Sequence, residues 1–225
     1  MFLQTALLVL RKDFAIEIKS REILFTTLLF ALSCVLIFSI AFVKEGEPLL
    51  DAAGGILWIA IEFAGTLALG RTFERERYAD TLRALLLAPA PRAAIYAGKM
   101  LGIVLLLAVV EALLVPLVAL LFHAQLLAAP LPLAALLAAG TIGFAAVGTL
   151  FAAMLVRARS RDVMLPILLY PMTVPVMIAG VRGTAALLQS PPDTAGVTMW
   201  IGMLAALDIV FVTIALWTFE PLMTE

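Results

Sequence analysis

The chain has 225 residues, of which 64% are hydrophobic and 14% are charged, and its mean hydropathy is +1.13. This apolar excess over the usual composition of soluble domains excludes an ordinary water-soluble fold, because most of the apolar surface would have to face water. The net charge of −1 gives no sign of a nucleic-acid partner, and the single cysteine, Cys34, excludes an internal disulfide.

The first predicted element is an amphipathic helix over residues 2–20. Leu3, Leu7, Phe14 and Ile18 recur at helical spacing, with basic residues among and after them. This pattern is typical of a helix that lies in the membrane interface. The order of apolar before basic residues argues against a cleaved signal peptide. The alternative is a ragged extension of the first membrane span.

Six apolar runs are long enough to cross a bilayer as helices, since about 20 residues suffice. Backbone groups cannot stay unpaired in hydrocarbon, which favours helices over irregular segments. The predicted spans are roughly residues 23–43, 52–70, 100–122, 131–156, 163–181 and 197–219. We therefore predict an all-α integral membrane protein with one transmembrane domain.

The basic residues predict the orientation of these spans. Four precede the first span, six lie between the second and third, and three lie between the fourth and fifth, so thirteen of the fifteen fall on one side. Only Lys44 and Arg182 fall on the other. Because cytoplasmic loops are enriched in Lys and Arg, both termini and the loop 71–99 are predicted to be cytoplasmic.

The loop 71–99 is the only sizeable hydrophilic stretch between spans. Leu82, Leu85 and Leu86 predict a short helix with an apolar face, which Pro89 and Pro91 end. A helix of this size is suited to docking on another protein. The alternative is a solvated loop that carries only topogenic charge.

Three acids, Glu62, Glu111 and Asp208, lie inside predicted spans. An acid in hydrocarbon needs a polar partner, a cavity or a proton, so each is a candidate for function. They either line a translocation path or form a conformational switch, or they make interhelical hydrogen bonds of structural value only.

Prolines are concentrated in the fifth predicted span, at Pro166, Pro171 and Pro175. Each removes a helical hydrogen bond, which predicts a kinked or broken span. Such a span either lines a cavity or only shapes the packing. Small residues share a face in the second and fourth spans and favour close helix packing, and a homodimer is a further expectation. They are Ala60, Ala64, Ala68, Ala135, Ala139 and Gly143.

Motifs of enzymes are missing from the sequence. Gly98 and Lys99 are followed by Met100 and lack the first glycine of a Walker A motif. The sole histidine, His123, is a candidate metal or haem ligand, although a histidine at the end of a span more often lies at the headgroup boundary. We predict a non-catalytic chain without a metal site or a resident cofactor, so any energy from ATP must come through a partner.

Three stretches resemble the haem exporter protein B family, the CcmB permeases of cytochrome c maturation. They are residues 55–60 (Gly-Ile-Leu-Trp-Ile-Ala), residues 73–91 of the hydrophilic loop, and residues 165–175 (Leu-Pro-Ile-Leu-Leu-Tyr-Pro-Met-Thr-Val-Pro). Within the loop, Asp80 and Arg83 stand where exporter permeases generally carry glycine and glutamate.

The resemblance implies the permease subunit of an ABC transporter in the inner membrane of a bacterial cell, with an elbow helix at 2–20 and a coupling helix in the loop. It implies a CcmA-type ATPase that binds the ATP, CcmC- and CcmD-type membrane subunits, a CcmE-type chaperone, and haem as cargo. The residues implied in coupling to the ATPase are Phe73, Glu74, Arg75, Glu76, Asp80, Thr81, Leu82, Leu85, Leu86, Pro89, Pro91 and Arg92.

Two other functions stay open on the sequence alone. One is an ABC permease that exports a lipid, a polysaccharide or a drug, and the other is a membrane scaffold that transports nothing. Whether haem itself crosses the protein, or only the release of a loaded chaperone is powered, also stays open. Membrane lipid is an expected partner in every case.

Overall fold

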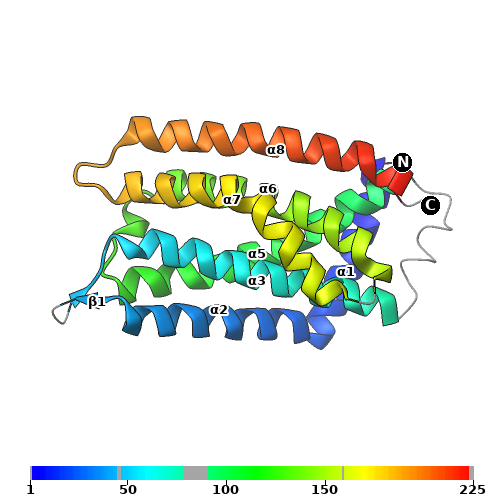
Figure 1. Ribbon diagram of the computed structural model, residues 1–225, viewed down its shortest axis with the longest axis horizontal. Helices are drawn as coiled ribbons and strands as arrows, with labels where there is room; N and C mark the ends of the chain where they lie inside the picture. The colour runs from blue at the N-terminus through cyan, green and yellow to red at the C-terminus, as the bar shows by residue number, and fades with distance from the viewer. Residues whose placement is uncertain (1, 45–46, 79–90, 159, 223–225) are drawn as a thin grey trace.

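The computed structural model describes residues 2–44, 47–78, 91–158 and 160–222, almost all of them helical (Figure 1). Within these ranges six helices are long and apolar enough to cross a membrane, which confirms the predicted all-α, six-span fold. They are α2 (Glu22–Ala41), α3 (Ala52–Tyr78), α5 (Arg92–Leu121), α6 (Pro130–Met154), α7 (Arg161–Leu188) and α8 (Thr194–Leu222).

Short elements connect the spans at the two ends of the bundle (Figure 1). One end, which we call the hairpin end, carries an antiparallel hairpin, the turn η1, and the connection between α7 and α8. The other end, the basic end, carries the turn η2, and α1 crosses the bundle there. The bounds are β1 (Val43–Lys44), β2 (Glu47–Pro48), η1 (Leu126–Ala128), η2 (Leu155–Arg157) and α1 (Phe2–Ser20).

The six spans pack in layers. Helix α8 lies along α6 and α7 on one side of the bundle, and α2 lies along α3 and α5 on the other (Figure 1). Helices α3 and α6 are the most buried spans, and α8 and α2 the least. Ala60, Ala64 and Ala68 are fully buried, so this face of α3 packs inside the chain and offers no surface to a second copy.

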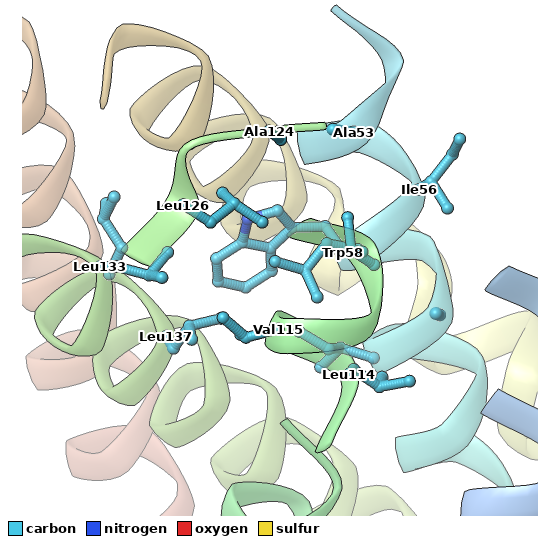
Figure 2. Packing of buried hydrophobic residues seen from close by; sticks show 14 of the residues in the cluster. Ala53, Ile56, Trp58, Leu114, Val115, Ala124, Leu126, Leu133 and Leu137 are labelled. Carbon is cyan, nitrogen blue, oxygen red and sulfur yellow. The ribbon is translucent and has the colours of Figure 1, made fainter. Parts of the chain in front are cut away.

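Trp58 organises the core near the hairpin end (Figure 2). Its indole Nε1 donates a hydrogen bond to Thr184 Oγ1 at 2.9 Å. A β-carbon at Gly140 or Gly180 would collide with the indole ring, so both positions require glycine for this approach. One side chain of α3 is thereby enclosed by α6 and α7, which holds the three helices together.

Four spans, α3, α5, α7 and α8, are longer than the sequence predicts, and the first two differ most at the basic end. Helix α3 continues past residue 70 to Tyr78, and α5 begins at Arg92 instead of residue 100. The early start of α5 has a packing cause, because Tyr96 and Lys99 are buried and the Tyr96 hydroxyl donates to the Ala146 carbonyl at 2.7 Å. Much of the predicted loop 71–99 is therefore helix.

Of the two predicted forms of the fifth span, kinked or broken, the structure shows the bent one. Helix α7 is continuous through Pro166, Pro171 and Pro175, and it bends in its basic-end half (Figure 1). Each proline leaves the carbonyl four residues earlier without its helical hydrogen bond, which lets a helix bend without ending it. The helix is also longer than the predicted 163–181 at both ends.

Candidate functional site at the basic end

The predicted coupling segment lies only partly within the described chain. The side chains of Arg75 and Glu76 are not described, although both residues belong to α3. The docking role predicted for the whole segment therefore stays a prediction. The coupling residues outside the described ranges are Asp80, Thr81, Leu82, Leu85, Leu86 and Pro89.

The flanks of that segment are well defined. Phe73 is only 1% exposed and belongs to the same buried cluster as Tyr96, so it anchors the end of α3 and offers no surface for docking. Glu74 lies 3.6 Å from Arg71 in an ion pair one helical turn away. Arg92, half-buried, opens α5 directly after the exposed Pro91.

These flanks are continuous with the membrane spans. Helix α3 runs unbroken from Ala52 to Tyr78, and α5 runs unbroken from Arg92 to Leu121. Helix α3 has no internal proline, and in α5 the only one is Pro116, far from the basic end, so both helices have regular hydrogen bonds at that end. Residues 79–90 join these two helix ends along the chain.

Helix α1 is fixed to the start of α5. The backbone of α5 at Gly98 lies against the Ala6 carbonyl and the Val9 side chain, and a larger residue there would collide with both. Beside this contact, Lys99 Nζ, 3% exposed, lies 2.7 Å from Asp13 Oδ2. The elbow helix α1 therefore packs against α5, although α2 is the next helix in the sequence.

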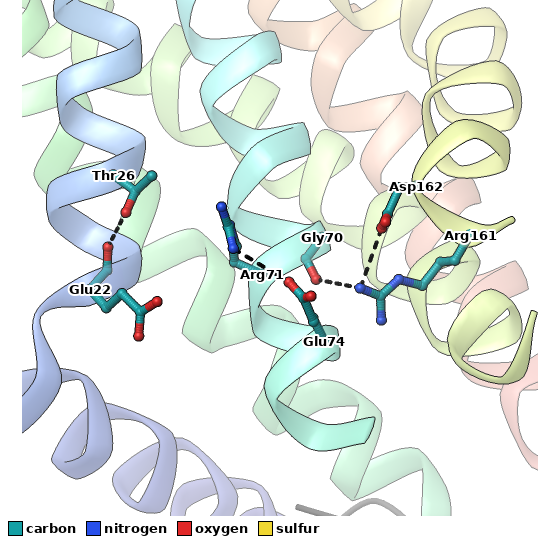
Figure 3. A network of polar contacts seen from close by, with 7 residues as sticks. All are labelled: Glu22, Thr26, Gly70, Arg71, Glu74, Arg161 and Asp162. Atoms are coloured by element: carbon teal, nitrogen blue, oxygen red, sulfur yellow. Dashed lines mark hydrogen bonds and ion pairs between the residues drawn. The ribbon is translucent and has the colours of Figure 1, made fainter. Parts of the chain in front are cut away.

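A polar network joins α3 and α7 at the basic end (Figure 3). Arg161, at the start of α7, is 5% exposed, and its Nη2 donates to the Gly70 carbonyl of α3 at 3.1 Å. The same nitrogen lies 3.5 Å from the carboxylate of the exposed Asp162. The other terminal nitrogen, Nη1, is buried and has no hydrogen-bond partner among the described residues.

A groove of about 610 Å³ lies beside this network, between α2, α3 and α7. Apolar side chains of all three helices form most of its wall, and Arg71, Glu74 and Asp162 lie at its basic end. Phe63 and Tyr170 face each other across it, with ring centroids 6.0 Å apart. The groove follows the bent half of α7.

Two of the three intramembrane acids pair with a threonine of another helix. The Thr173 hydroxyl of α7 donates to Glu62 Oε1 of α3, and the Thr141 hydroxyl of α6 donates to Glu111 Oε1 of α5. Asp208 of α8 instead lies against Gly143, and its buried Oδ1 has no partner within the described chain. The three acids are therefore spread over separate helix contacts.

The structure offers no metal site in the residues it describes, where no three His, Cys, Asp or Glu side chains are grouped. His123 is exposed at the end of α5, with a positive φ of 52° that ends the helix. Whether it binds a metal or haem, or lies at the headgroup boundary, stays open.

Sequence reasoning missed three of the contacts described above. Arg161 counts in the sequence only as a topogenic charge, and Lys99 only as part of a hydrophilic loop. Trp58 appears only within a family-like stretch. Threonines inside apolar runs, such as Thr141 and Thr173, were an available signal for partners of the buried acids, because hydroxyl groups bond across membrane helices.

Six helices that are long and apolar enough to cross a membrane, with an amphipathic helix across one end, define a multi-pass membrane protein. The chain belongs to the CcmB protein family, whose profile matches residues 4–221. It is 30% identical over 175 residues to heme exporter protein B of Rhodobacter capsulatus, covering 78% of this chain and 77% of that protein. It is 26% identical over 189 residues to heme exporter protein B of Pseudomonas aeruginosa, covering 84% of each.

Proposed function

We propose that this chain is the membrane subunit of an ATP-driven haem exporter that acts in cytochrome c maturation. The observation that carries the proposal is the family match over nearly the whole chain, together with relatives that are named heme exporter protein B. The alternatives, a permease for another cargo and a membrane scaffold, gain no support from the comparisons.

The fold supports an energy input from outside the chain. The sequence has no nucleotide-binding motif, so a separate CcmA-type ATPase supplies the work. Residues 79–90 connect two stiff helices at the basic end, which makes this segment the natural contact for that ATPase. We further propose an inner-membrane location with the basic end in the cytoplasm.

The remaining partners follow from the same proposal. CcmC- and CcmD-type membrane subunits complete the complex, and a CcmE-type chaperone receives the haem. ATP hydrolysis drives either the passage of haem or the release of the loaded chaperone. Haem that builds up on the cytoplasmic side without ATP hydrolysis indicates the first mode, and haem-loaded chaperone retained on the complex indicates the second.

The test is complementation combined with co-purification. In cells that lack their own CcmB protein, the wild-type chain should restore cytochrome c maturation and retain the ATPase on purification. The double variant Leu82→Asp, Leu85→Asp should lose both, because two buried charges at a docking face each cost several kcal/mol.

A matched control places the same charges at the opposite end. Leu49→Asp with Leu50→Asp changes two exposed leucines at the hairpin end, between β2 and α3, and should leave the ATPase bound. Failure of the wild-type chain to restore maturation would disprove the function. Retention of the ATPase by the Leu82, Leu85 variant would instead place the contact elsewhere.

A further inference from the structure

Polar contacts join α3 to α7 along much of their length. Trp58 bonds Thr184 near the hairpin end, Thr173 bonds Glu62 in the middle of the span, and Arg161 bonds the Gly70 carbonyl at the basic end. The first two connect side chains that face the core. The third is made by a guanidinium, which stays charged, and it lies at the end of α3 that finishes at Tyr78.

The two helices take paths of different length between the last two contacts. From Glu62 to Gly70 the α3 axis advances about 12 Å, whereas from Thr173 to Arg161 the α7 axis advances about 18 Å, at about 1.5 Å per residue. Helix α7 is therefore the longer of the two in this interval, and Tyr170 keeps contact with α3 there, since its ring lies 6.0 Å from that of Phe63. The groove of about 610 Å³ lies along this part of α7, and Pro166 lines it.

The bent, basic-end half of α7 is the part that can move. Pro166 and Pro171 remove hydrogen bonds there, and a helix bends most easily where its hydrogen-bond ladder is interrupted. Beyond it, Gly180 and Thr184 are held against the ring of Trp58. The outer half of α7 is thus fixed, while the inner half has a compliant backbone and an open groove beside it.

Burying the charged side chain of Arg161 costs free energy that an apolar residue of similar size would not cost. Its guanidinium is almost fully buried, and one of its nitrogens has no acceptor within the described ranges. Hydrogen bonds from charged donors are stronger than neutral ones, so the bond to Gly70 holds the start of α7 firmly to α3. The second nitrogen is a donor available for another carbonyl when the helices shift.

We propose that Arg161 is a positioning residue that transmits displacement of the basic end of α3 to the bent half of α7. Movement of the helix end that includes Glu74 and Tyr78 is carried by the Gly70 carbonyl to the guanidinium. The inner half of α7 then closes or opens the groove while Trp58 holds the outer half. This inference rests on the proposed ATP-driven function.

The first test compares variants of Arg161 in the purified complex with its ATPase and in the maturation assay. Arg161→Met should lower cytochrome c maturation about tenfold or more, the effect of one to two kcal/mol on a rate, while ATP hydrolysis continues. Arg161→Lys keeps a charged donor and should restore most of the coupling. Arg182→Met, on the exposed outer part of the same helix, is the matched control and should behave as wild type.

The second test replaces the hydrogen bond by a covalent link. In a Cys34→Ser background, Gly70→Cys and Arg161→Cys place thiols on the two helices, and a side chain at residue 70 meets no atom within 4 Å. A short bifunctional thiol reagent should restore maturation to the double variant above its untreated level. The two single-cysteine variants should gain nothing from the reagent.

Each result decides for or against the proposal. The proposal is overturned if the Arg161→Met protein supports as much cytochrome c maturation as wild type. It is also overturned if cross-linking the double-cysteine variant does not raise its maturation activity. If Arg161→Met is not recovered in folded form, Arg161→Lys is compared with Arg161→Gln, and equal coupling by these two overturns it as well. Failure of the proposed function itself appears separately, as a wild-type chain that does not support maturation.

Discussion

Thr141 and Thr173 give two buried acids a hydroxyl partner on a neighbouring helix. An unpaired polar group in hydrocarbon is costly, so such a pair holds two helices in one relative position. Asp208 has no equivalent donor at its buried oxygen within the described chain, and it contacts the backbone of Gly143. The acids therefore divide into two with a structural explanation and one without.

Thr141→Val should destabilise the protein without changing side-chain volume. It leaves the Glu111 carboxyl group without its hydroxyl partner, at a cost of about 1–3 kcal/mol. Thermal unfolding of the detergent-purified protein should show a lower Tm. Thr213→Val, on the exposed face of α8, is the control and should leave Tm unchanged. Equal melting of both variants would show that the Thr141 hydroxyl contributes nothing.

Asp208→Asn should lower maturation activity about tenfold, corresponding to about 1.4 kcal/mol in the rate, while the protein still inserts. The reason is that asparagine keeps the shape of the side chain and removes its capacity for charge. Glu111→Gln is the companion variant, which keeps an acceptor for Thr141. If both variants keep full activity in the maturation assay, Asp208 and Glu111 have a structural role and none in transport.

Helix α7 is held by its glycines as much as by its hydrogen bonds. Gly180 leaves room for the ring of Trp58, and Gly183 leaves room for Leu136 of α6. Close approach of this kind is how membrane helices associate, because lipid gives no hydrophobic drive for helix contact. The outer half of α7 is therefore specified by small residues.

Gly180→Ala should destabilise the bundle by about 1–3 kcal/mol, because the added methyl group overpacks the site against Trp58. Gly202→Ala is the matched control, since no atom lies within 4 Å of a β-carbon there. It removes a flexible residue from α8 and should be neutral or slightly stabilising. Thermal unfolding measures both, and a Gly180→Ala protein as stable as wild type would contradict the packing around Trp58.

Helix α1 depends on α5 for its position. Lys99→Met removes one ion pair of Asp13 and leaves the one with Lys12, so the cost should be about 1–3 kcal/mol, below that of a fully buried pair. Limited proteolysis should then cut α1 faster. Lys19→Met, which changes an exposed lysine of the same helix, should leave the cleavage rate unchanged. Identical cleavage of both variants would show that the ion pair does not hold α1.

The two ends of the molecule differ in charge as the sequence predicts. Thirteen of the fifteen Lys and Arg residues belong to segments at the basic end or to the stretch between α3 and α5, while Lys44 and Arg182 are near the hairpin end. An even number of spans brings both termini to the same end. The bundle is therefore polarised along the membrane normal.

Reporter fusions measure that polarity directly. A reporter fused after Pro48 or after Pro192 should read as external, because both positions are at the hairpin end, and a fusion within residues 79–90 should read as cytoplasmic. A cytoplasmic signal at either hairpin-end site would invert or break the six-span topology. The terminal fusion after Glu225 serves as the cytoplasmic reference.

The number of spans, the elbow helix and the family were all predictable from the sequence. The end residues of α3, α5 and α7 were harder to predict, because a polar or proline-rich stretch can stay helical when a neighbouring helix covers it. Tyr96 shows this, since its hydroxyl finds the Ala146 carbonyl inside the bundle. The spacing of apolar residues within one segment does not show which group of another helix its polar side chains will meet.

That this protein belongs in a membrane, and which end of it is basic, can be read from the amino-acid sequence. Hydrophobicity and charge act locally and add along the chain, so both can be evaluated without a fold. The contacts of Trp58 with Thr184, 126 residues away, and of Arg161 with Gly70, 91 residues away, are seen in the folded chain alone. Such pairs depend on how the helices bend and how closely they approach, which is a property of the packed bundle and of no single segment.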